Sequence, residues 1–99
     1  MFVAVLTYVR PLKEIDALMH EHVAFLEKQY DAGLLIASGR QVPRTGGVIL
    51  IRSADLERVR AVLSEDPFVV AGAATFELIE FKPSRMHKDF KPFSKPIDN

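Results

Sequence analysis

Strand-like and helix-like segments alternate along this chain in an order that few folds accommodate. Four segments have the apolar composition of strands: Phe2–Tyr8, Leu34–Ser38, Gly47–Ile51 and Ala74–Lys82. Apolar residues at helical spacing fill the intervals between the first and second and between the third and fourth of them. The order is therefore β-α-β-β-α-β. It predicts an α+β, ferredoxin-like fold with one antiparallel sheet and both helices on a single face.

Proline, glycine and short polar residues mark where the helices begin and end. Pro11 suits the first turn of a helix over residues 12–31, and Gly33 is a natural stop after it. Ser53 stands where the second helix needs an N-cap. Asp66 and Pro67 interrupt that helix and predict a short third one, with the carboxylate as its cap.

Composition narrows the functional class. The chain has 99 residues, with 13 basic and 13 acidic side chains and no cysteine. One domain is expected at this length, and the neutral net charge argues against a general nucleic-acid binder. No stretch approaches the roughly 20 apolar residues of a membrane helix, and the N-terminus lacks a signal-peptide pattern. We therefore expect a cytoplasmic protein without nucleic-acid or membrane partners.

The periodic patterns stop where the last strand ends. Residues 1–83 are expected to form the ferredoxin-like domain, and residues 84–99 a separate tail with several prolines and lysines. The helices would cover one face of the sheet, yet the strands carry apolar side chains on both faces. A second copy of the chain is the simplest cover for the open face. The sequence thus predicts a homodimer.

Two ionisable residues stand out against this background. His22 falls on the apolar face of the first helix, so its ring points toward the sheet. Spacing alone favours a core histidine bonded to a backbone carbonyl, whereas a general acid or base is the functional alternative. A helix-capping role is enough to explain an aspartate at position 66. The alternative is that its carboxylate orients the ring of His22. Spacing does not place the two side chains together.

Other candidates lie around the second strand. Ser38 and Gly39 could contact a substrate oxygen or simply form a turn, and Arg40 or Arg44 could pair with an acidic substrate or stay solvated. His20 lies two positions from the histidine singled out above, so on a helix their rings point apart. No metal site is expected.

Three segments together carry a resemblance to a known family. They are His22–Leu26, the run Asp31–Leu35 followed by Ala37–Gly39, and Asp66–Gly72, after which a closing strand ends in Phe81-Lys82-Pro83. In this order they resemble the YCII-related (YciI-like) family over about residues 2–83. Members often have an arginine at the position of Met19 and a proline at the position of Arg40.

The resemblance implies a dimeric α+β barrel related in architecture to muconolactone isomerases. It also implies a site built on a histidine–aspartate pair, which maps onto His22 and Asp66. Ser38 matches the small residue that members place before the glycine near that site. Most members have no assigned reaction, although one relative eliminates chloride from a chlorinated hydroxyquinol. Kinship of fold does not by itself establish catalysis.

Two main functional hypotheses follow. The first is a cofactor-independent enzyme of isomerase or lyase type that acts on a small, cyclic, acidic compound. His22 would move the proton, Asp66 would fix its tautomer, and substrate contacts would come from Ser38, Gly39 and Arg40. The second is a non-catalytic dimeric module that binds a small molecule or supports an assembly. A barrel that oxidises a quinol or handles haem is a third interpretation, which no residue selects.

Overall fold

Four antiparallel strands form one sheet in the order β2-β3-β1-β4. The computed structural model describes residues 1–98. The strands are β1 (Phe2–Tyr8), β2 (Leu35–Arg40), β3 (Gly46–Ile51) and β4 (Ala74–Glu80). The helices are α1 (Leu12–Ala17), α2 (Met19–Asp31), α3 (Leu56–Leu63), α4 (Pro67–Val70) and the 3₁₀ helix η1 (Lys88–Phe93). This arrangement confirms the predicted ferredoxin-like α+β fold.

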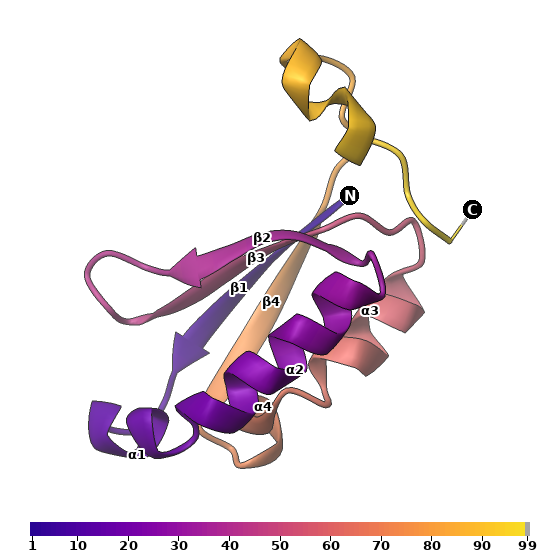
Figure 1. Cartoon of the computed structure of the whole chain (residues 1–99). Helices are drawn as coiled ribbons and strands as arrows, with labels where there is room; N and C mark the ends of the chain where they lie inside the picture. The colour runs from indigo at the N-terminus through magenta and orange to yellow at the C-terminus, as the bar shows by residue number, and fades with distance from the viewer. Residues whose placement is uncertain (99) are drawn as a thin grey trace.

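The core lies between the sheet and the two longer helices, α2 and α3 (Figure 1). Alternate residues of β1 point toward it, and Phe2, Ala4 and Leu6 are buried. Val59 and Leu63 of α3 are also buried and belong to the same cluster. Burying side chains of this size contributes about 1.5–3 kcal/mol each. This packing holds α2 and α3 on one side of the sheet, as predicted.

The predicted helix over residues 12–31 is two helices, so that prediction is wrong in one respect. The helix is interrupted at Leu18, which has φ −100° and ψ −2° and separates α1 from α2. Ile15, Leu18 and Met19 pack around the buried Phe68. No proline or glycine marks the break, and residues on both sides of it belong to this packing. After α2 the expected stop is present, because Gly33 has a φ of +78°.

The predicted cap of the second helix is also wrong. The N-cap of α3 is Asp55, whose carboxylate accepts a hydrogen bond from the Arg58 backbone N–H at 3.1 Å. Ser53 lies two residues earlier, fully buried, and its hydroxyl oxygen accepts from the Asp55 N–H at 3.0 Å. The serine therefore supports the turn before the helix rather than the helix itself.

Strand ends differ modestly from the sequence-based bounds. Pairing with β3 carries β2 beyond Ser38 to Arg40, with an irregularity in register between Leu35 and Ala37. The last strand ends at Glu80, two residues before the predicted end at Lys82. An irregularity of this kind changes the direction in which the side chains after it point, here those at the end of β2.

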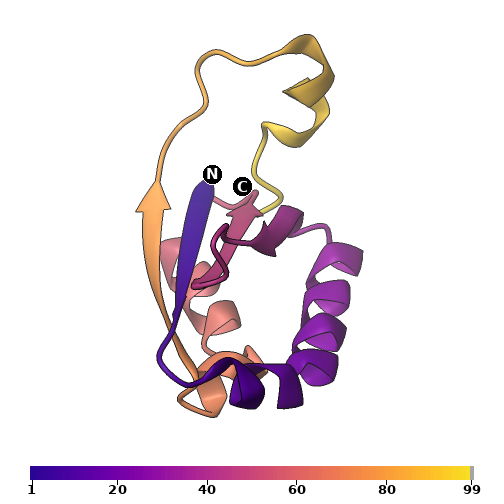
Figure 2. The same cartoon turned by 90° about the vertical axis from the view of Figure 1, so that its left-hand side faces the viewer.

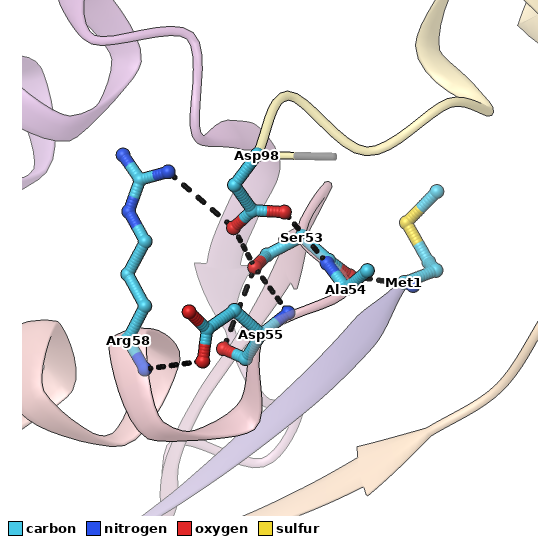
Figure 3. Close-up of polar contacts among 6 residues, drawn as sticks. All are labelled: Met1, Ser53, Ala54, Asp55, Arg58 and Asp98. Carbon is cyan, nitrogen blue, oxygen red and sulfur yellow. Dashed lines mark hydrogen bonds and ion pairs between the residues drawn. The ribbon is translucent and has the colours of Figure 1, made fainter.

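The C-terminal segment rises from the sheet as an arch that contains η1 and returns toward the start of β1 (Figure 2). Its return is fixed by Asp98, whose carboxylate accepts hydrogen bonds from the Ser53 hydroxyl and the Ala54 N–H, the latter at 3.0 Å (Figure 3). Arg58 of α3 adds an ion pair at 3.3 Å. Asn99, the last residue of the predicted tail, lies outside the described residues. The division of the chain at residue 83 stays a prediction.

Candidate functional site

His22 and Asp66 are brought together by two helix starts. His22 lies in the second turn of α2, and Asp66 is the N-cap of α4, with Pro67 at its first position. His22 Nδ1 lies 2.9 Å from Asp66 Oδ1, although 44 residues separate them along the chain. The same Oδ1 accepts a hydrogen bond from the Phe68 N–H at 2.9 Å. The capping and partner roles considered for Asp66 are therefore compatible.

The contact with Asp66 fixes the tautomer of His22. A carboxylate oxygen without a proton can only accept, so the donor proton belongs on Nδ1. Nε2 then carries the lone pair and is the ring nitrogen that can take up a proton. The ring also stacks on Phe68, with centroids 4.0 Å apart and planes 14° apart. His22 is held in both rotation and plane.

The second oxygen of Asp66 has no such support. Asp66 is fully buried, and its Oδ2 has no hydrogen-bond partner among the residues that the structure describes. Leaving a buried polar atom unpaired costs about 1–3 kcal/mol, and more when the group is charged. Asp66 is thus paired through one oxygen only, with His22 and with a single backbone N–H.

A pocket of about 360 Å³ opens beside His22. Its wall is mostly apolar, with contributions from Leu6, Met19, Leu26, Ile49 and Phe68. Its polar side chains are those of Tyr8, His22, Ser38, Arg40 and Arg44, and none of the lining residues is acidic. The pocket can therefore hold a small apolar body and present hydroxyl and cationic donors to its oxygens.

The substrate-contacting residues expected from the sequence line this same pocket, whereas Asp66 is not among its lining residues. Ser38, Gly39 and Arg40 contribute from the end of β2. The Ser38 hydroxyl lies 2.7 Å from the Tyr30 hydroxyl of α2, so it has a fixed neighbour rather than free rotation. The structure thus brings the predicted substrate contacts to the space that His22 faces.

Arg44 also lines the pocket, from the loop between β2 and β3. Its guanidinium Nη2 donates to Asp16 Oδ1 of α1 at 2.5 Å. This hydrogen bond raises the pKa of Arg44 above its ordinary value. The charge of Arg44 is therefore secure, and it is shared with Asp16.

Sequence reasoning missed three aromatic residues of the site. Phe68 carries the His22 ring, Tyr8 packs edge-on against Phe68 at 5.8 Å, and Tyr30 holds Ser38. A signal existed for Phe68, because the Asp-Pro pair before it fixes the direction of α4. No comparable local signal marks the two tyrosines, because their roles depend on how strand and helix pack.

Metal binding and membrane insertion each require features that can be recognised in the described part of the chain. Within residues 1–98, no group of three or more histidine, cysteine or acidic side chains could hold a metal ion. No helix there combines the length and the apolar character needed to cross a membrane.

Comparisons with known proteins agree with this fold. The structure is similar to that of 5-chloro-2-hydroxyhydroquinone dehydrochlorinase from Burkholderia phenoliruptrix AC1100, solved in complex with 2,5-dihydroxybenzoquinone. The TM-score is 0.68 at 19% sequence identity, and the match covers 83% of this chain and 94% of the dehydrochlorinase. No curated protein gives a significant match to the sequence. The model of the YCII-related domain matches residues 1–82, so the chain belongs to the YCII-related family.

Proposed function

We propose that this protein is a cofactor-independent enzyme that transfers a proton on a small, cyclic, acidic compound, in a reaction of isomerase or lyase type. The observation that carries the proposal is the hydrogen bond between His22 and Asp66 at the wall of an apolar pocket. An imidazole held by a buried carboxylate is an arrangement that suits general acid–base chemistry near neutral pH.

The chemistry needs only the side chains already described. Nε2 of His22 accepts a proton from the substrate, and the ring becomes an imidazolium. Asp66 keeps the Nδ1 proton in place and offsets the new positive charge. The proton then returns to a different atom of the substrate in an isomerisation, or stays on the base while an anionic leaving group departs in an elimination. In both cases the substrate oxygens would be held by Ser38, with Gly39 and Arg40 beside it.

The substrate class follows from the lining of the pocket. Apolar walls accommodate a ring. The lining contains two arginines and no acidic residue, which favours a ligand with a negative charge. The similar dehydrochlorinase was solved with a small cyclic dione, 2,5-dihydroxybenzoquinone. A ligand of that size is compatible with a pocket of about 360 Å³.

The test is the turnover of His22→Gln. The first compounds to assay are 5-chloro-2-hydroxyhydroquinone, by chloride release, and muconolactone, by its isomerisation. Replacement of a general acid or base typically lowers the rate by about 10²- to 10⁴-fold, and we expect a loss of that size in kcat. His20→Gln is the matched control, because His20 is exposed on the same helix.

Two results would contradict the assignment. Equal turnover by His22→Gln and the parent protein would remove His22 from the mechanism. Binding of both compounds without any turnover would favour the alternative, a non-catalytic module that binds a small molecule. As an independent check, ¹⁵N NMR of the parent protein should find the neutral ring protonated at Nδ1.

We further propose that the open face of the sheet pairs with a second copy of the chain. Ile79 of β4 is 56% exposed and Val48 of β3 is 38% exposed, which leaves apolar surface on the sheet. Sedimentation velocity at micromolar concentration should find a dimer, and a monomer under those conditions would contradict the pairing.

A further inference from the structure

One ion pair joins the edge of the pocket to a different element of the fold. Arg44 lies in the loop between β2 and β3, whereas Asp16 belongs to α1. Their side chains meet at 2.5 Å, with Arg44 26% exposed and Asp16 61% exposed. The arginine is thus the more covered member of the pair, and the aspartate is the one that water reaches.

Arg44 faces the pocket, but Asp16 is not among the residues that line it. A guanidinium has five N–H donors in a planar fork, and the described contacts show Asp16 taking one of them. A planar oxyanion in the pocket would use the same fork for a bidentate contact, which is the geometry that arginine recognises best, so it would compete with Asp16 for this arginine. The pocket lining holds no carboxylate that would compete from within.

We propose that Arg44 binds the anionic group of the ligand, and that Asp16 competes with the ligand for this arginine. The inference rests on the proposed function, because it takes the pocket as the ligand site. It goes further by naming Arg44 as the residue that selects ligands by their charge. The ligand it describes is a small cyclic compound with a carboxylate or an equally planar oxyanion. Binding then exchanges one carboxylate partner of Arg44 for another.

Arg44 suits this role better than Arg40, the other arginine of the pocket. Arg40 is an exposed residue and forms none of the described ion pairs. Charges near water are screened by salt more strongly than partly covered ones. The contact with Asp16 also holds the Arg44 side chain in one place before the ligand arrives, so less conformational freedom is lost on binding.

The exchange has a definite energetic direction. An exposed ion pair contributes little, so its loss should cost the ligand only about two- to fivefold in affinity. A charge-assisted hydrogen bond to a ligand in a partly closed pocket is worth about 10- to 100-fold. The competition therefore weakens binding without preventing it, and removing Asp16 should strengthen it.

The test compares benzoate with benzamide, which have nearly the same shape but differ in charge. Titrations of the full chain followed by ¹H–¹⁵N NMR give the dissociation constants of both compounds. Arg44→Gln should lower benzoate affinity about 10- to 100-fold and leave benzamide unchanged. Arg44→Lys, which keeps the charge but loses the planar fork, should fall between the parent and the glutamine variant.

The second half of the test concerns the competitor. Asp16→Asn should raise benzoate affinity about two- to fivefold. Glu14→Gln on the same helix is the matched control, because Glu14 is exposed and takes no part in the described ion pairs. The gain from Asp16→Asn should disappear when Arg44→Gln is added.

Three outcomes would overturn the inference. The first is a charge preference that survives Arg44→Gln but is lost in Arg40→Gln. The second is weaker benzoate binding by Asp16→Asn, as expected if the ion pair only fastens the loop to α1. The third is absence of benzoate binding by Asp16→Asn. Benzoate binding by His22→Gln keeps this test separate from the test of proton transfer. If that variant loses turnover but still prefers benzoate to benzamide, the role of His22 is affected and the role of Arg44 is not.

Discussion

Asp66 and Asp98 are both carboxylates removed from water beside the start of a helix, but their hydrogen bonding differs. Asp98 uses both oxygens, one for the Ala54 N–H and the other for Ser53 and Arg58. Asp66 uses Oδ1 twice and leaves Oδ2 without a described partner. One carboxylate is completed by its surroundings, and the other is not.

The difference fits a structural role for Asp98 and the role proposed above for Asp66. A fully paired carboxylate rigidifies the segments that it joins, here the arch and the turn before α3. Asp66 instead directs its one paired oxygen at His22 and at the Phe68 N–H. The comparison therefore supports the proposal that places the chemistry beside His22.

The largest expected effect on stability is that of Asp66→Ala. This change removes the cap of α4 and leaves both the Phe68 N–H and His22 Nδ1 without their acceptor. We expect the free energy of unfolding to fall by about 2–4 kcal/mol in urea titrations. Asp66→Asn keeps a capping oxygen and should cost less. A smaller loss for Asp66→Ala than for Asp98→Ala would break the comparison.

A smaller effect, with a distinct pH dependence, is expected for Asp98→Asn. Burial acts to raise the pKa of Asp98, but hydrogen bonds from Ala54 and Ser53 outweigh it, and the pKa lies below its ordinary value of 3.8. The ionised carboxylate therefore stabilises the fold above about pH 4, and this contribution is lost as the pH falls through the folded-state pKa.

We expect Asp98→Asn to lower the free energy of unfolding by about 1 kcal/mol at pH 7. The difference from the parent protein should shrink toward zero below the folded-state pKa. Asp89→Asn is the control within the same arch, because the Asp89 side chain is 81% exposed. A difference that stays constant as the pH falls would show that the carboxylate charge of Asp98 does not fasten the arch.

Much of the fold was predictable from local patterns. The first strand over Phe2–Tyr8 agrees with its sequence-based bounds, and Asp66 caps a short helix as its place before Pro67 predicts. These features depend on alternation and on backbone preferences, which a short stretch of sequence contains. The break at Leu18 was not predictable, because no helix-breaking residue marks it.

The candidate site depended on a different kind of information. Spacing gave no reason to place His22 beside Asp66, and only the family resemblance paired them before the structure did so. Their catalytic role stays a prediction. The contact that fixes the arch was likewise not predictable from local sequence. Asp98 is one acidic residue among many in the sequence, and its contact with Ser53 depends on the return of the whole segment.

The stacking of His22 on Phe68 has a stereochemical consequence. A ring fixed in plane by an aromatic neighbour and in rotation by Asp66 presents its free nitrogen in one direction. Under the proposed mechanism, a ligand bound in the pocket exchanges its proton on one side only. The handedness of any centre made or removed there would then be determined in part by Phe68, a side chain that itself carries no exchangeable proton.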